Sequence, residues 1–271
     1  MEMIVSTTSI NMKQNEKNGL PSFDRATISE EEWEIRVALA ATYRLIAHYG
    51  WDDLVYTHIS ARVPGPEHHF LINPYGLMFE EITASSLMKI DLDGNAVIAT
   101  DWSINAAGFT IHSAIHQHAE DANCVIHTHT DAGLAVAAQK HGLLPLSQTS
   151  MLILGDLAYH DYEGVALNLD ERARLLNDMG DKHLMILRNH GNLTIGKNCS
   201  DAFLRMYYLE RACTAQVKAL STGHENLNLP NQGVAEFTSG QSRGLFDKGR
   251  EGPPWHALLR LLDRTNPGYD Q

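Results

Sequence analysis

Three histidines in this chain have the spacing that a metal site requires. His127 and His129 flank Thr128 in a short run, residues 124–130, that is typical of a β-strand. Residues i and i+2 of a strand point to the same face, so the two imidazoles are expected side by side. His190 follows another apolar run in an Asn-His-Gly turn. It is the candidate third ligand, because a catalytic metal site commonly takes three protein ligands and keeps one open position. Neutral imidazole suits Zn, Fe, Ni or Cu.

The elements that would position these histidines alternate between helices and strands, as in an α/β domain. Helical periodicity or capping predicts helices near residues 30–49, 83–88, 109–120, 132–139, 169–179, 201–220 and 255–263. Alternation predicts a hairpin from residues 57–63 and 69–73, and further strands at 96–98, 124–130 and 184–187.

The composition excludes several classes of protein. The 271 residues carry 21 Lys and Arg against 33 Asp and Glu, a formal net charge of −12. An acidic chain without a basic stripe is a poor partner for nucleic acid or an anionic membrane. No apolar run reaches the ~18 residues that span a bilayer. Cys124, Cys199 and Cys213 are odd in number and form no CxxC pair, which favours a reducing, cytoplasmic setting.

We expect one α/β domain at residues 26–222 with an appended segment at each end. Residues 1–25 are polar and lack the basic and apolar regions of a signal peptide, so they predict a mobile tail. Residues 223–271 predict a loop or linker rich in Gly, Asn and Ser up to residue 252, followed by a short helix.

Five motifs, in their order along the chain, resemble the class II aldolase/adducin family, whose best-known enzymes are the fuculose-phosphate and ribulose-phosphate aldolases and epimerases. The resemblance runs from about Trp33 to Leu220. The motifs are THISAR (57–62), NPYG (73–76), DLDG (91–94), VIHTH (125–129) and NHG (189–191). The runs TASSL (83–87), AGFTIHSAI (107–115) and AYHDY (158–162) are most similar to the adducin head and its bacterial counterparts.

This resemblance implies a three-layer α/β/α fold with a mixed central sheet. It also implies a homo-oligomer, usually a tetramer, with active sites at subunit interfaces and a C-terminal piece that packs on a neighbouring subunit. The family's aldolases bind zinc through the histidines that match His127, His129 and His190, and the metal acts as a Lewis acid. Iron is the second candidate, because another branch of the superfamily contains non-haem iron oxygenases.

Two departures from the aldolase pattern bear on the reaction. The family's glutamate, a metal ligand or general acid/base, is replaced by Gly108. The family's phosphate-binding positions are occupied by His58, Tyr75, Ala106 and Ala107, and only His58 and Tyr75 keep a hydrogen-bond donor. We therefore expect a non-phosphorylated substrate in a pocket that the small residues leave open, with His58, Tyr75 and Gly76 as substrate-binding residues.

Two residues are candidates for the missing proton-transfer group. His112 lies one helical turn after Gly108 and shares a helix face with it. His112 and His116 are also spaced for a second metal pair, although an exposed helix face explains that spacing as well. Tyr159 belongs to a polar cluster near the pocket in the family layout, and the alternative for this cluster is a hydrogen-bonded turn.

The leading hypothesis is a metal-dependent lyase that cleaves or decarboxylates a keto- or hydroxy-acid-like small molecule. Two alternatives remain open: a non-haem iron oxygenase of the same superfamily, and a non-catalytic, adducin-like scaffold or interaction module.

Overall fold

The computed structural model describes residues 25–118, 122–164, 170–242 and 252–271. The predicted tail at residues 1–25 therefore lies outside the described residues, apart from Arg25 at the start of the short 3₁₀ helix η1 (Arg25–Thr27). Further 3₁₀ turns are η2 (Phe79–Glu81), η3 (Leu154–Asp156) and η4 (His224–Asn226).

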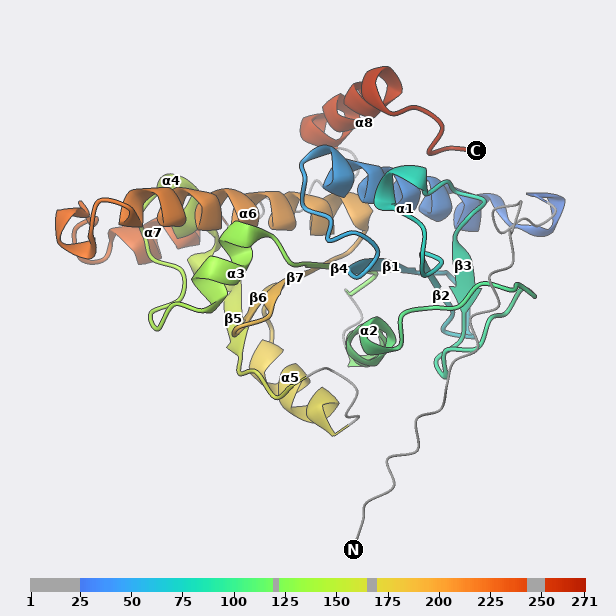
Figure 1. Cartoon of the computed structure of the whole chain (residues 1–271), viewed down its shortest axis with the longest axis horizontal. Coiled ribbons are helices and arrows are strands. Elements are labelled where there is room, and N and C mark those ends of the chain that lie inside the picture. Colours follow the sequence, from blue (N-terminus) through green and yellow to red (C-terminus); the bar gives the residue numbers. More distant parts are fainter. Residues whose placement is uncertain (1–24, 119–121, 165–169, 243–251) are drawn as a thin grey trace, which may run out of the picture.

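Seven strands form one mixed sheet through the middle of the molecule (Figure 1). Their order is β3-β2-β1-β4-β7-β6-β5, and every neighbouring pair is antiparallel except β5 and β6. The predicted hairpin is confirmed as β1 and β2. The strands are β1 (His58–Arg62), β2 (Phe70–Ile72), β3 (Met88–Ile90), β4 (Cys124–Thr128), β5 (Leu157–His160), β6 (Leu184–Leu187) and β7 (Gly191–Gly196).

Helices cover both faces of this sheet, which confirms the predicted three-layer α/β/α fold (Figure 1). On one face lie α1 (Glu30–His48) and α6 (Cys199–Leu220), with α3 (Asp131–Ala137), α4 (Gln148–Ile153) and α7 (Val234–Gln241) beside α6. On the other face lie α2 (Ala106–His118) and α5 (Glu171–Met179), while α8 (Pro253–Thr265) packs on the outer side of α1.

The two faces of the central strand β4 belong to different cores, because neighbouring side chains of a strand point to opposite faces. Cys124 and Ile126 pack into the core under α1 and α6. Val125 packs into the core under α2 and α5. By the same alternation His127 lies on the α2 side of the sheet and Thr128 on the α6 side.

The start of α1 follows its predicted cap only in part. The Ser29 side chain accepts a hydrogen bond from the Glu32 amide, as an N-cap should. The Glu32 carboxylate does not complete a capping box. It pairs instead with Arg36 at 2.9 Å and with Lys89 at 2.8 Å, so it ties α1 to β3.

The structure corrects three predicted elements. Residues 83–86 form a turn rather than a helix, because Thr83 and Ser86 bond each other's backbone and side-chain atoms. Residues 96–98 form no strand, although Ala96 makes an isolated bridge to Ile90. The predicted linker at 223–252 contains η4 and α7, which packs on α4.

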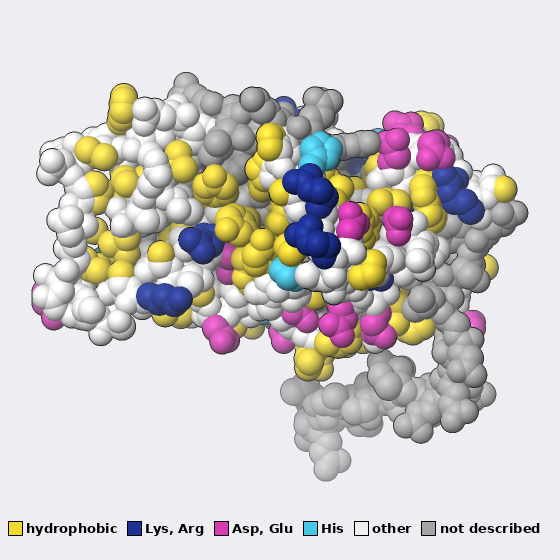
Figure 2. All heavy atoms as spheres, turned by 90° about the horizontal axis from the view of Figure 1, so that it is seen from above, with side chains coloured by type: hydrophobic (Ala, Val, Ile, Leu, Met, Phe, Trp, Pro, Cys, Tyr) yellow, Lys and Arg dark blue, Asp and Glu magenta, His cyan; other side chains and the backbone are white. Residues whose placement is uncertain are grey.

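The outer face of α8 is charged where it meets solvent. His256, Arg260 and Arg264 are exposed at intervals of four residues, while Trp255 and Leu262 are buried against α1. From this side the molecule shows a short row of basic side chains bordered by acidic and hydrophobic ones (Figure 2). None of the helices in the described part of the chain is both long and apolar enough to cross a bilayer.

Candidate metal centre

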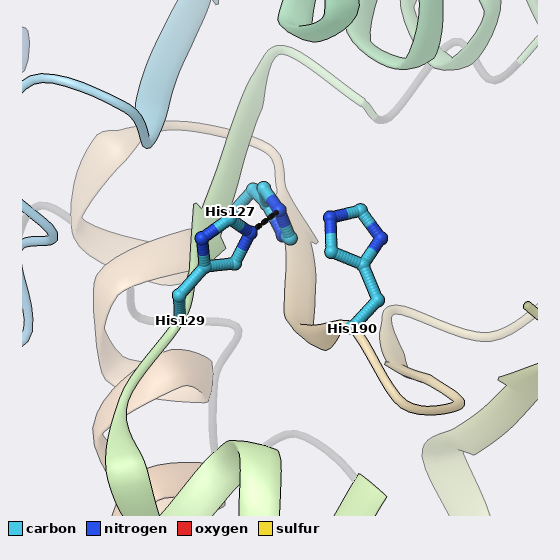
Figure 3. A group of neighbouring side chains, drawn as sticks. All are labelled: His127, His129 and His190. Atoms are coloured by element: carbon cyan, nitrogen blue, oxygen red, sulfur yellow. Dashed lines mark hydrogen bonds between the residues drawn. The ribbon is translucent and has the colours of Figure 1, made fainter. Parts of the chain in front are cut away.

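The three predicted ligands converge at the end of β4. His127 is the last residue but one of β4, and His129 lies directly after the strand. His190 approaches them from the turn between β6 and β7 (Figure 3). One potential ligand atom of each residue lies within 4.8 Å of the others. His127 is buried, whereas His129 and His190 are partly exposed. The sequence prediction that these three side chains come together is therefore consistent with the geometry.

The turn that carries His190 depends on a glycine. Asn189 adopts a left-handed conformation (φ +56°), and Gly191 has a φ of +153°. A Cβ atom on Gly191 would lie 2.4 Å from the carbonyl oxygen of Thr128. Because only glycine tolerates both the backbone angle and the close approach, the Asn-His-Gly sequence brings His190 against β4.

Hydrogen bonds orient His127 and His129 toward one point. The Nδ1 atom of His127 donates to the Asn192 carbonyl at 2.9 Å, and the Nδ1 atom of His129 lies 3.0 Å from the Asp53 carboxylate. In neutral rings both Nε2 atoms then carry lone pairs, and these two atoms are 2.8 Å apart. Two facing lone pairs need a proton or a cation between them. This donor set, with its carboxylate-bound histidine, fits a divalent metal.

Burial favours the neutral form of two of these imidazoles, His127 and His190. It lowers the pKa of His127 well below its usual value and that of His190 to about 4, and neighbouring histidines add to both effects. A metal ligand must be deprotonated, so neutral rings are ready to bind.

Glu210 of α6 supports the site from the opposite face of the sheet, and sequence reasoning missed it. Its carboxylate accepts hydrogen bonds from Thr128 at 2.9 Å, Thr130 at 2.6 Å and the Asn192 amide at 3.0 Å. It is 1% exposed, and burial raises its pKa. These bonds join Thr128, between the two histidines of the motif, and Thr130, directly after them, to Asn192 of β7. No local pattern on α6 signals this role.

A cavity of about 430 Å³ opens in front of the three histidines. The described residues that line it also include Asp53, Tyr56, His58, Tyr75, Asn105, Ile111, Tyr162 and Gly164. Asp53 is the one charged side chain among them. The cavity thus combines a metal-binding end with a rim of tyrosines and offers no lysine or arginine from the described part of this chain.

The other predicted site residues lie at different distances from this cavity. His58 and Tyr75 line it, but Gly76 does not. His112 is fully buried behind His58, with ring centroids 4.3 Å apart. Tyr159 is not brought to the cavity: its hydroxyl accepts the Leu143 amide at 2.9 Å, and its ring stacks on Arg188.

Two expectations about the helix α2 are wrong. Gly108 does not leave open space, because a Cβ atom there would lie 2.4 Å from Cε1 and Nε2 of His58, whose ring fills the volume. The pair His112 and His116 does not form an exposed helix face, since both rings are buried and both bond Ser60 of β1. The side chains of Ala106 and Ala107 lie outside the described atoms.

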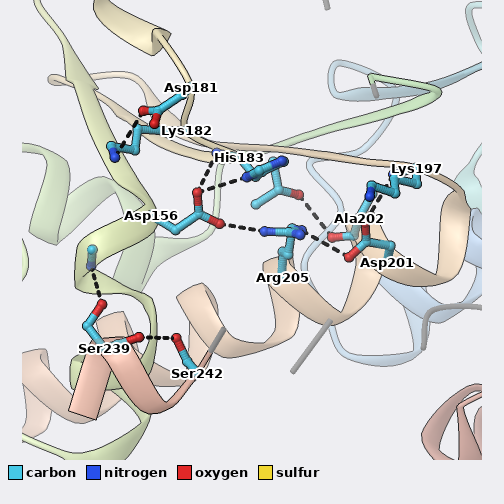
Figure 4. Close-up of polar contacts among 12 residues, drawn as sticks. Asp156, Asp181, Lys182, His183, Lys197, Asp201, Ala202, Arg205, Ser239 and Ser242 are labelled. Carbon is cyan, nitrogen blue, oxygen red and sulfur yellow. Dashed lines mark hydrogen bonds and ion pairs between the residues drawn. The ribbon is translucent and has the colours of Figure 1, made fainter. Parts of the chain in front are cut away.

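A larger cavity, of about 850 Å³, lies between α7 and the start of β5 and β6, but Asp156 and Arg205 in its lining are already paired. Asp156 accepts from His183 at 2.8 Å and from Arg205 at 2.5 Å, and Arg205 also bonds Asp201 at 3.0 Å (Figure 4). This network fixes α6 to the strands. In contrast, the two imidazole nitrogens of His58, in the wall of the histidine cavity, have no hydrogen-bond partner among the described residues.

Comparison with known proteins places this geometry in a family context. Residues 37–217 match the family model described as "Class II Aldolase and Adducin N-terminal domain". An aldolase II superfamily protein from Pseudomonas syringae is 50% identical in its crystal structure, with a TM-score of 0.85 over 91% of this chain and 99% of that one.

Of two further relatives, one is named as an aldolase and the other as an adducin. An L-fuculose 1-phosphate aldolase from Glaciozyma antarctica is 27% identical, with a TM-score of 0.74 over 92% of this chain and 96% of that one. Mouse alpha-adducin is 40% identical over 93% of this chain, but the match covers only 36% of alpha-adducin. The relatives thus include both a protein named as an aldolase and a protein named as an adducin.

Proposed function

Because this chain belongs to the class II aldolase and adducin family, we propose that it is a metal-dependent, lyase-like enzyme that uses His127, His129 and His190 to hold the metal. The observation that supports this most strongly is the pair of Nε2 atoms 2.8 Å apart, each oriented by a hydrogen bond on the other ring nitrogen. We propose Zn²⁺ as the metal and Fe²⁺ as the second choice, since imidazole suits both. When bound, such an ion supplies Lewis acidity for a developing enolate or alkoxide.

The reaction that we propose is C–C cleavage or decarboxylation of a keto- or hydroxy-acid-like substrate that carries no phosphate. A phosphate dianion is usually held by several donors or by Arg and Lys. The described cavity lining supplies no such cation and places the Asp53 carboxylate beside the histidines. Tyr56, Tyr75 and Tyr162 supply neutral hydroxyls and aromatic surface at the rim, which suits a neutral or singly charged ligand.

The residues of this chain have separable roles in that proposal. His127, His129 and His190 hold the metal, Asp53 and Glu210 orient the ligand-bearing segments, and Tyr75 contacts the substrate. Tyr159 has no role in this proposal, because it does not line the cavity and its hydroxyl is bonded to the Leu143 amide. His112 stays out of direct substrate contact, because His58 lies between it and the cavity.

Metal content is the first test. We expect near-stoichiometric zinc, measured by mass spectrometry, in protein purified without chelator or a His tag, and its loss in a His127→Ala, His129→Ala double variant. The matched control is His256→Ala, because His256 lies exposed on α8. Near-stoichiometric iron would favour the oxygenase instead. A site that also refuses added zinc and iron would contradict the enzyme and favour an adducin-like scaffold.

Turnover and assembly are tested next. Metal-loaded protein is incubated under nitrogen with a panel of keto and hydroxy acids, and products are followed by mass spectrometry. Cleavage that disappears in the double variant supports the lyase, whereas a loaded protein that cleaves none of the panel contradicts it.

We also propose that the protein is a homo-tetramer. Light scattering coupled to gel filtration measures its mass in solution directly.

A further inference from the structure

A buried chain of polar groups ends at His58, on the wall of the metal cavity. His112 and His116 of α2 both contact the Ser60 hydroxyl of β1, at 2.6 Å and 2.7 Å. His116 continues to the Ala122 carbonyl at 2.7 Å. The His58 and His112 rings lie against each other. All three histidine rings are at least 96% buried.

The donors and acceptors of these hydrogen bonds determine which ring nitrogens of His112 and His116 carry a proton. A carbonyl only accepts, so His116 carries its proton on Nδ1. Burial lowers the pKa of His116 to about 4, so the ring is neutral at pH 7 and its Nε2 is a lone pair. Ser60 must then donate to His116 and accept from His112 Nδ1. His112 is left with a lone pair on Nε2, and that atom has no hydrogen-bond partner within the described structure.

The ring of His58, which lies next to His112, also lacks hydrogen-bond partners. Both ring nitrogens of His58 are buried without a hydrogen-bond partner in the described structure. A neutral His58 has one N–H and one lone pair. If its N–H turns to His112, its own lone pair remains. If its N–H turns to the nearby Tyr56 carbonyl, two lone pairs remain. In both arrangements at least one acceptor that lacks a donor remains at the His58 end of the cavity, where the wall covers it from solvent.

Gly108 is the residue that allows this arrangement. A Cβ atom at position 108 would lie 2.4 to 2.5 Å from three atoms of the His58 ring. His58 is 4% exposed, so its ring has little room to move aside. The glycine and the histidine therefore act as a pair, in which the missing side chain of one makes room for the other.

We propose that the His58 end of the metal cavity is a subsite for a hydroxyl group of the substrate, which donates to the unpaired imidazole nitrogen. This inference deepens the proposed function and rests on it: the substrate is a hydroxylated keto or hydroxy acid whose free hydroxyl lies at His58. Carboxylates and phosphate dianions are acceptors only at pH 7, so they cannot satisfy a lone pair. Leaving a buried acceptor unpaired is costly, which makes the subsite selective.

Ligand binding to cobalt-loaded protein tests the subsite without requiring turnover. The visible absorption of Co²⁺ is titrated with lactate, glycerate, erythronate and 3-phosphoglycerate, which share an α-hydroxy acid. We expect glycerate or erythronate to bind about three- to tenfold more tightly than lactate, the worth of one neutral hydrogen bond. The phosphorylated acid should bind more weakly than glycerate. Equal affinities for lactate and both hydroxylated acids, or tightest binding of 3-phosphoglycerate, would overturn the proposal.

Variants assign the preference to His58. His58→Phe keeps an aromatic ring but has no lone pair, so it should reduce the preference to less than twofold, whereas His256→Phe at an exposed position of α8 should retain it. The opposite pattern would overturn the proposal. Because the readout is binding, absence of any C–C cleavage would contradict the proposed reaction and leave this result standing.

Two further measurements test the proton position on His112 and the contact between Gly108 and His58. In metal-free protein, ¹⁵N NMR of the histidines should show a non-protonated Nε2 on His112, with His112→Gln used for assignment, and a proton on that atom would refute the accounting. Gly108→Ala should remove the hydroxyl preference. In a His58→Asn background, whose shorter side chain leaves room, the same alanine should destabilise the fold less. Additive effects in this cycle would rule out the Gly108–His58 pairing.

Discussion

The side-chain amide of Asn192 donates to the buried Glu210 carboxylate at 3.0 Å, while its backbone carbonyl accepts the Nδ1–H of His127 at 2.9 Å. Asn192 thus connects a carboxylate on the α6 face of the sheet with a ligand histidine on the α2 face. Through this residue, we expect a change on one side of the sheet to affect the candidate metal centre on the other.

Glu210→Ala should therefore weaken metal binding although Glu210 is no ligand. We expect a loss of about 10- to 100-fold in metal affinity, as for other residues that orient ligands. The variant also leaves two threonine hydroxyls and an amide without their acceptor, at a cost of about 1–3 kcal/mol in unfolding free energy. Glu210→Gln should recover part of both. Chelator competition and urea unfolding measure them, with exposed Arg211→Ala as the control. Unchanged affinity in Glu210→Ala would contradict the role.

Asp53→Asn tests the carboxylate behind His129. The Asp53 oxygen lies 3.0 Å from His129 Nδ1 and fixes which nitrogen faces the cavity. An amide that rotates can offer its N–H instead, so we expect metal affinity to fall by about 10- to 100-fold. Asp52→Asn changes the same charge one residue away and should leave the affinity unchanged. Equal losses in the two variants would show that only net charge matters.

Acid stability should report the buried neutral histidines. Burial lowers the folded-state pKa of His116 from 6.5 to about 4, so the unfolded chain binds a proton first as the pH falls. The stability due to the neutral ring is complete above about pH 6.5 and is lost progressively toward about pH 4. Each such histidine contributes about 1.4 kcal/mol per pH unit within this window.

The comparison that checks this uses metal-free protein unfolded by urea at pH 7, 6 and 5. His116→Gln should show a slope lower by about one proton, on top of a lower stability at pH 7. His256→Gln, at an exposed position of α8, should keep the slope of the unsubstituted protein. If His116→Gln keeps that slope as well, folding does not lower the pKa of His116.

Tyr43→Phe should destabilise the β1 edge of the site. The buried Tyr43 hydroxyl accepts from the Ile59 amide at 2.8 Å and from the Asn73 amide at 3.2 Å, and it lies 2.8 Å from the Asn73 side chain. Removing the oxygen leaves two buried amides without an acceptor, at a cost of about 1–3 kcal/mol. Tyr207→Phe on α6, half-buried, should change the unfolding free energy by less than about 0.5 kcal/mol. Similar effects of both variants would contradict the bonding role.

The sequence predicted those parts of the molecule that depend on local pattern. The β1–β2 hairpin and the common face of His127 and His129 follow from alternation over a few residues. The three-layer fold followed from the order of the motifs. The helix predicted at residues 83–88 failed because threonine and serine side chains compete for the backbone there. Helix α7 was missed because its surroundings have the composition of a linker.

The remaining features depend on partners distant in the sequence. Nothing near Glu210 indicates that three donors from β4, the segment after it and β7 meet at its carboxylate. The spacing of His112 and His116 is the same on a buried face as on an exposed one, and Ser60 of β1 decides between them. Gly108 suggested open space because its neighbour in the fold, His58, lies in another segment.

The position of His190 beside β4 has a consequence for the mechanics of the chain. A metal held by His129 and His190 would act as a removable cross-link that closes a long loop containing α3, α4, β5, α5 and β6. Such a link would lower the entropy of the unfolded chain much as a disulfide does, in a protein whose three cysteines are all free. Metal supply would then set how quickly this half of the molecule opens to proteases, independently of any substrate.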